Sequence, residues 1–147
     1  PSGNALAVEA LLRLSALTGS ESMRRRAEQT LTLYAKAMEE SPSACPRMIT
    51  ALHRYLRGDV EIAVIGSPHH RQDFLQVVHS HFLPQRILAG SSVADGETTE
   101  EEICVLLEGR RAQPAAYVCQ HQVCSAPLTT PDALKSALRQ LNGSEAM

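Results

Sequence analysis

The stretch "VEIAVIG", residues 60–66, decides the fold, because the pattern of apolar residues changes there. It is a β-branched run that ends in Gly66, as a buried strand should. Ser67 and Pro68 follow, and they suit the N-cap and first position of a helix over residues 72–81. This stretch therefore predicts the start of an α/β unit.

The chain after this strand continues to alternate strands and helices. "QRILAG" (85–90) and "AAYVC" (115–119) predict two more strands. Thr99 and Glu102 fit a capping box for a helix that runs to about Leu107. Thr130 and Pro131 open a last helix. Because crossovers through helices join parallel strands, we expect residues 58–147 to form a small, mostly parallel βαβαβ-α unit.

The chain before this strand is helical. Residues 5–17 are apolar on nearly every side, and helical stripes follow over residues 23–38 and 48–56. The first helix should be buried nearly all round, but the chain offers it only two neighbours. The chain also begins with Pro1 rather than Met. We therefore expect residues 1–57 to be part of a larger helical body, and we expect the isolated chain to self-associate through its exposed apolar faces.

Composition argues against several classes of function. The formal net charge is -2, and Trp is absent, which leaves neither a basic stripe nor an aromatic platform for nucleic acid. No apolar run approaches the roughly 18 residues of a membrane span, and we expect no signal peptide. Four cysteines at uneven spacing are not typical of a secreted disulfide scaffold. We expect a reducing, cytoplasmic compartment, with neither nucleic acid nor membrane as a partner.

Cys119 and Cys124 lie five residues apart, and three readings of this pair stay open. They meet only if residues 120–123 turn, and a hairpin there would bring them into disulfide range. An active redox pair usually has the closer C-x-x-C spacing at a helix N-terminus. We favour reduced cysteines that pack in the core, ahead of a structural disulfide and of a redox pair.

A metal site or a cofactor site receives less support. His121 lies between the two cysteines, and Cys45 or Cys104 could complete a set of four ligands, but a second closely spaced pair is absent. The histidines at 69, 70, 79 and 81 read as surface residues. Neither G-x-G-x-x-G nor G-K-[ST] occurs. We expect no metal and no cofactor.

Three stretches carry a family resemblance: "PSGNALAVEALLRLSALTG" (1–19), "SPSACPRMITAL" (41–52) and "AAYVCQHQVCSAPLTTPDAL" (115–134). Together they resemble the C-terminal end of the thioredoxin-domain family that includes the mammalian spermatogenesis-associated protein and bacterial YyaL-like proteins. The similarity spans essentially the whole chain, and the motifs occur in the order of the family.

The resemblance implies a protein with an N-terminal thioredoxin-like domain, an (α/α)6 toroid like that of six-hairpin glycosidases, and a short α/β end. This chain would hold the last helices of the toroid and the α/β end, with the rest of the parent chain as its partner. Ser2, Gly3 and Asn4 would line a pocket for a small carbohydrate, although the Asp-Gly pair that precedes this motif in the family is missing here. The parent would be a sugar epimerase- or glycosidase-like enzyme. The alternative is a redox or scaffold protein whose chemistry lies in the thioredoxin-like domain.

Overall fold

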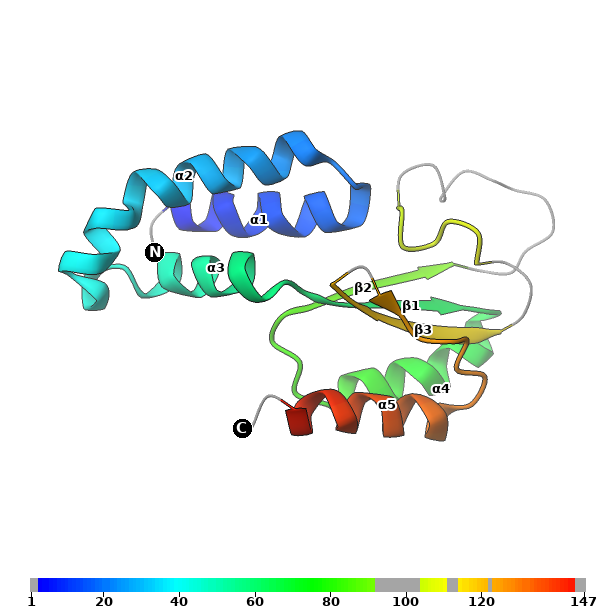
Figure 1. Ribbon diagram of the computed structural model, residues 1–147. Coiled ribbons are helices and arrows are strands. Elements are labelled where there is room, and N and C mark those ends of the chain that lie inside the picture. Colours follow the sequence, from blue (N-terminus) through cyan, green and yellow to red (C-terminus); the bar gives the residue numbers. More distant parts are fainter. Residues whose placement is uncertain (1–2, 92–103, 111–113, 122, 145–147) are drawn as a thin grey trace. The chain divides into compact units, whose positions relative to one another are not determined.

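The computed structural model describes residues 3–91, 104–110, 114–121 and 123–144 (Figure 1). These residues form two compact units that divide between Asp59 and Val60, two residues after the boundary predicted from the sequence. No helix within the described ranges is long and apolar enough to cross a bilayer.

Unit 1 consists of three α-helices and one short 3-10 helix. The elements are α1 (Gly3–Thr18), α2 (Glu21–Glu40), η1 (Pro42–Ala44) and α3 (Pro46–Arg57). Local residues set these bounds, as predicted. Gly19 has a positive φ of 68° after α1, and the Ser20 side chain accepts a hydrogen bond from the Met23 amide at the start of α2. Gly58 ends α3 with a φ of 75°.

The core of unit 1 is one apolar cluster to which all three helices contribute. Its buried members are Ala5, Val8, Leu12, Ala27, Leu31, Met38, Met48 and Ala51. Helix α1 buries a single stripe in this cluster rather than its whole circumference, and Leu6 and Leu14 stay 44% exposed. Within this chain, α1 therefore has fewer neighbours than its apolar sequence could occupy.

The described residues of unit 2 form a four-stranded sheet and two helices. The elements are β1 (Val60–Ile65), α4 (Pro68–His79), β2 (Arg86–Ser91), β3 (Ala115–Gln120), β4 (Val123–Cys124) and α5 (Pro131–Ser144). The three predicted strands and the helices after Ser67 and Thr130 are confirmed. The amide of His70 donates to the Ser67 hydroxyl, and the amide of Ala133 donates to the Thr130 hydroxyl.

The sheet is mixed, so the prediction of a mostly parallel sheet is wrong. Its strand order is β2-β1-β3-β4; β1 is parallel to β2 but antiparallel to β3, and β3 is antiparallel to β4. The register explains the difference. Ser91 at the end of β2 and Ala115 at the start of β3 both pair with Ile65. Because β3 begins at the same end of the sheet where β2 stops, the chain reverses direction instead of crossing over.

The prediction of a helix from Thr99 to Leu107 is also wrong for the residues of that range that the structure describes. Residues 99–103 lie outside the described residues. Residues 105–109 form turns, in which the amide of Leu107 donates to the carbonyl of Cys104 and that of Glu108 to Val105. The connection between β2 and β3 therefore has no described crossover helix, which agrees with the antiparallel direction of β3.

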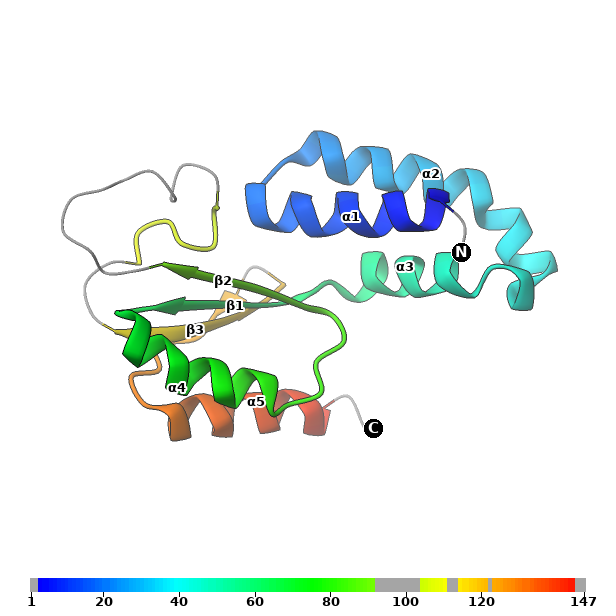
Figure 2. The same cartoon turned by 180° about the vertical axis from the view of Figure 1, so that it is seen from behind.

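The two helices of unit 2 cover the same face of the sheet. Both views show α4 and α5 side by side on that face (Figures 1 and 2). Strand residues alternate between faces, so Ile62, Val64, Ala116 and Val118 pack with Phe74, Val78, Leu134 and Leu138 of the helices. The opposite face carries Glu61, Ala63, Tyr117 and Cys119.

Candidate functional site

The predicted carbohydrate pocket has only two residues in the structure, because Ser2 lies outside the described residues. Gly3 is the first residue of α1, and its α-carbon has open space around it. Asn4 is exposed, and its Nδ2 donates a hydrogen bond to the Tyr34 hydroxyl of α2. This contact ties the first turn of α1 to α2, which is a structural use of the Asn4 side chain.

An apolar groove lies between α2 and α3 in unit 1. Its volume is about 490 Å³. It is lined by Glu28, Leu31, Thr32, Ala35, Met38 and Glu39 of α2 and by Ile49, Leu52 and Tyr55 of α3. Six of these nine side chains are hydrophobic or aromatic, so the groove suits an apolar surface better than a charged metabolite.

The polar end of the groove is held by Tyr55 and its neighbours. A hydrogen bond with Glu28 raises the pKa of the Tyr55 hydroxyl, and burial and the negative charge of Glu28 add to this. The guanidinium of Arg24 lies 5.0 Å from the centre of the Tyr55 ring. These groups pair with one another across α2 and α3, which leaves the apolar wall as the surface that a partner would contact.

Cys119 and Cys124 form a disulfide in the structure, whereas the sequence favoured reduced cysteines. Strands β3 and β4 are joined by a two-residue loop, and the two cysteines face each other across the hairpin with Cα atoms 3.9 Å apart. His121, the first loop residue, has a positive φ of 51°, which fits the turn types that close short hairpins. Cys45 and Cys104 are free thiols.

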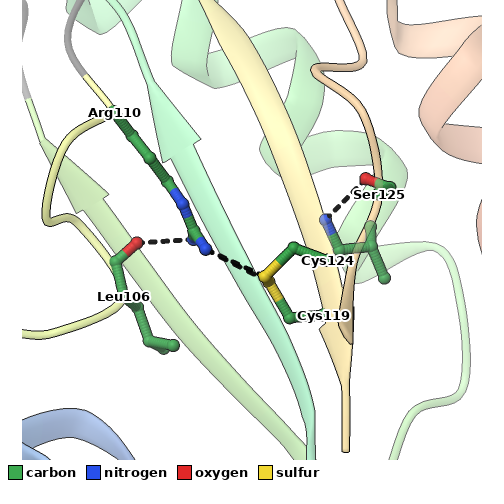
Figure 3. The surroundings of a disulfide bond; sticks show 6 residues. Leu106, Arg110, Cys119, Cys124 and Ser125 are labelled. Carbon is green, nitrogen blue, oxygen red and sulfur yellow. Dashed lines mark hydrogen bonds between the residues drawn. A yellow bond between two sulfur atoms is a disulfide. The ribbon is translucent and has the colours of Figure 1, made fainter. Parts of the chain in front are cut away.

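Arg110 holds the disulfide from outside the hairpin (Figure 3). Its Nη2 donates to Sγ of Cys119 at 3.3 Å and to Sγ of Cys124 at 3.0 Å. Its Nη1 donates to the carbonyl oxygen of Leu106 at 2.6 Å, and the guanidinium lies 4.9 Å from the centre of the Tyr117 ring. The cation is therefore fixed by backbone, ring and sulfur contacts together.

The structure offers no support for metal binding among the described residues. Nowhere in ranges 3–91, 104–110, 114–121 and 123–144 do three His, Cys, Asp or Glu residues gather as a metal site. Both sulfurs that would bind with His121 are engaged in the disulfide. His69, His70 and His79 are exposed, and His81 is half-buried with its Nδ1 2.8 Å from the Val77 carbonyl oxygen.

A buried ion pair in unit 1 joins α3 to the residue after Gly58. The Arg54 side chain is 6% exposed and that of Asp59 is 7% exposed, and Nη1 lies 2.6 Å from Oδ1. Burial raises the pKa of Asp59 from 3.8 to about 6, although the positive charges of Arg54, Arg13 and Arg24 oppose this. Desolvation thus outweighs the attraction of three arginines at this carboxylate.

Sequence reasoning missed the roles of Arg110 and Asp59. Arg110 lies nine residues before Cys119, in a segment with no motif, and Asp59 is a single acidic residue between a helix and a strand. The only feature of the sequence that could have indicated the buried ion pair of Asp59 is its position directly before a buried strand.

Comparison with known proteins relates the chain to one group of larger proteins. It is 31% identical to spermatogenesis-associated protein 20 of Rattus norvegicus over 95% of its own length, and 31% identical to the Homo sapiens protein over 94%. An uncharacterised Caenorhabditis elegans protein is 29% identical over 87% of the chain. No protein-family model matches the chain, and no solved structure matches it.

The chain spans only 18% of the length of each of these relatives, and it matches the C-terminal part of spermatogenesis-associated protein 20. The similarity extends over nearly all of this chain, so both units have counterparts in the relatives. This partial coverage of the relatives is consistent with the chain being a piece of a larger protein.

Proposed function

We propose that this chain is a structural C-terminal part of a larger protein, in which unit 1 supplies the last helices of an (α/α)6 toroid and unit 2 caps it. The occupant of the groove between α2 and α3 is then a helix of the preceding part of the same protein. The observation that carries this proposal is the apolar groove, together with the match to 18% of the relatives' length.

Exposed leucines on the same helices support this proposal. Leu33 of α2 is 80% exposed and Leu56 of α3 is 69% exposed, and α1 exposes Leu6 and Leu14 as well. Single exposed leucines are ordinary on a monomer, but here they occur in a three-helix unit that also carries an apolar groove between α2 and α3. Burying such surface contributes roughly 25 cal/mol per Å² of apolar area, so further helices packed on unit 1 would stabilise it.

Cytoplasmic location belongs to the same proposal. The free thiols of Cys45 and Cys104 are compatible with a reducing compartment, whereas the Cys119–Cys124 disulfide by itself gives this location no support. A role of the parent in carbohydrate chemistry rests on the toroid analogy alone. The alternative of redox chemistry in a separate thioredoxin-like domain likewise concerns residues outside this chain.

The test is association between this chain and the segment encoded directly upstream of it, produced as two polypeptides in one cell. Ala35 is exposed on α2 and lines the groove, so Ala35→Arg fills the groove with little cost to the helix. Gln29 is exposed on α2 outside the groove, and Gln29→Arg is the matched control.

We expect the two polypeptides to co-purify, Ala35→Arg to abolish co-purification, and Gln29→Arg to leave it unchanged. Co-purification that survives Ala35→Arg would overturn the choice of the groove. A different result would also contradict the proposal: the chain associates with itself but not with the upstream segment, and Ala35→Arg removes this self-association. The groove would then belong to a second copy of the chain.

A further inference from the structure

The two sulfurs of the disulfide in unit 2 differ in their access to solvent. Cys119 is 1% exposed on the central part of the sheet, whereas Cys124 lies on the two-residue edge strand β4 and is exposed. Thiol–disulfide exchange requires that a thiolate approach one sulfur, and access decides which one is attacked. An incoming thiolate therefore meets Cys124 first, and Cys119 is the sulfur that leaves.

Arg110 is placed where charge develops in that reaction. Its Nη2 already donates to both sulfurs, at 3.3 Å and 3.0 Å, and its Nη1 bond to the Leu106 carbonyl keeps the guanidinium in place (Figure 3). A fixed cation beside a cysteine favours the thiolate over the thiol. It stabilises the reduced form of the pair more than the neutral disulfide, which makes the disulfide easier to reduce.

We propose that the Cys119–Cys124 disulfide is a thiol–disulfide exchange site that a dithiol reductant reduces by attack on Cys124, with Arg110 stabilising the thiolate released from Cys119. This inference concerns unit 2 alone and does not rest on the packing role proposed for unit 1.

The exchange balances in two steps. In the first, a thiolate of the reductant forms a bond to Sγ of Cys124, the Cys119–Cys124 bond breaks, and Cys119 leaves as a thiolate beside Nη2 of Arg110. In the second, the other thiolate of the reductant attacks its own sulfur in this mixed disulfide and releases Cys124. The protein disulfide gains two electrons, the dithiol becomes a disulfide, and the two protons of the reductant end on the protein cysteines or in solvent.

The hairpin has bonds that survive reduction. The amide of Ser125 donates to the Val118 carbonyl at 2.8 Å, and the amide of Val118 donates to the Ser125 hydroxyl at 3.2 Å. Further along, Ala116 and Leu128 exchange two backbone hydrogen bonds of 2.9 Å. The two thiols should therefore stay close after reduction, so that oxidation can restore the disulfide.

Other ionisable groups share this part of the sheet. Glu61 of β1 pairs in register with Cys119 and occupies the same face, so its negative charge opposes the thiolate that Arg110 favours. Tyr117 lies under the guanidinium of Arg110, and His121 occupies the hairpin loop. Removing the charge of Glu61 should therefore change the equilibrium constant for reduction of the disulfide in the opposite direction to removing the charge of Arg110.

The experiment is redox equilibration of the whole chain with defined ratios of reduced and oxidised dithiothreitol, followed by alkylation and peptide mass mapping of each cysteine. We expect native protein to be reduced at Cys119 and Cys124 while its circular dichroism is unchanged. Arg110→Gln should lower the equilibrium constant for reduction by about tenfold, which corresponds to roughly 30 mV. Arg110→Lys should restore most of this loss, and Glu61→Gln should shift the equilibrium toward the dithiol.

Two further measurements keep the proposal falsifiable if Arg110→Gln fails to fold. Brief treatment with glutathione should place the mixed disulfide on Cys124; a mixed disulfide on Cys119 would overturn the proposal. In Cys124→Ser, alkylation of Cys119, followed by peptide mapping, should show a midpoint below the ordinary thiol pKa of about 8.5, whereas a midpoint at or above it would contradict the role of Arg110. A disulfide that is reduced only after denaturation would identify a purely structural bond and end the proposal.

Discussion

The buried carboxylate of Asp59 should make unit 1 less stable as the pH rises. Desolvation raises its pKa from 3.8 to about 6, so the folded chain binds this proton more tightly than the unfolded chain does. The stability from this proton is fully present below about pH 3.8 and is lost as the pH rises through about 6. One pKa unit corresponds to about 1.4 kcal/mol, so the whole loss is about 3 kcal/mol.

The substitution Asp59→Asn isolates this effect, because asparagine keeps the shape of the side chain but does not titrate. The quantity to measure is the free energy of unfolding of the native chain minus that of the variant, from urea denaturation at several pH values. We expect this difference to fall by about 2.5 kcal/mol between pH 4 and pH 8, with most of the fall between pH 4 and pH 6.5.

Glu40 provides the control, because its substitution removes an exposed carboxylate instead of a buried one. It lies 3.6 Å from Lys36 with its side chain 64% exposed, and exposed ion pairs contribute little. Glu40→Gln should change the free energy of unfolding by less than about 0.5 kcal/mol across the same range. A difference for Asp59→Asn that stays flat, or rises with pH, would show that attraction to Arg54 outweighs desolvation and would refute the reasoning.

Two further predictions concern stability, and both are read from urea denaturation. Leu134→Ala should cost about 3 kcal/mol because Leu134 is fully buried between the sheet and the helices, whereas Leu33→Ala, at an 80% exposed position, should cost less than about 0.5 kcal/mol. Gly66→Ala should cost about 2 kcal/mol, because Gly66 has a φ of 146° and a new Cβ would lie 3.3 Å from Pro114. Gly109→Ala, with a φ of 70° but open space, should cost about half as much. Equal costs in either pair would contradict the packing described for these positions.

The strands and helix ends could be predicted because they depend on neighbouring residues. The run at 60–65 is β-branched, and Ser20, Ser67 and Thr130 each accept a bond from an amide three residues later. Such signals act over a few residues, and the folded chain retains them.

The direction of β3 could not be predicted in this way. It depends on the path of the chain between Ser91 and Ala115, and the capping pattern at Thr99 favoured a crossover helix that the described residues 104–109 do not form. Because β3 begins at the end of the sheet where β2 stops, it runs antiparallel to β1.

The candidate sites were harder to predict than the strands, because they depend on contacts between distant segments. The spacing of Cys119 and Cys124 allowed a disulfide but did not require one, and the two-residue turn through His121 decided the outcome. Arg110 reaches the sulfurs because its guanidinium is fixed by the Leu106 carbonyl and the Tyr117 ring. No sequence pattern encodes that contact.

The most direct test of the packing role is the reactivity of a cysteine placed in the groove of unit 1. Ala35→Cys lines the groove and Gln29→Cys lies on α2 outside it, and each would be labelled with a maleimide in this chain alone and in the longer protein encoded with its upstream segment. We predict that Cys at position 35 reacts readily in the isolated chain and at least tenfold more slowly in the longer protein, while position 29 reacts alike in both. Equal reactivity at position 35 in the two proteins would show that the groove stays open and would contradict the proposed packing.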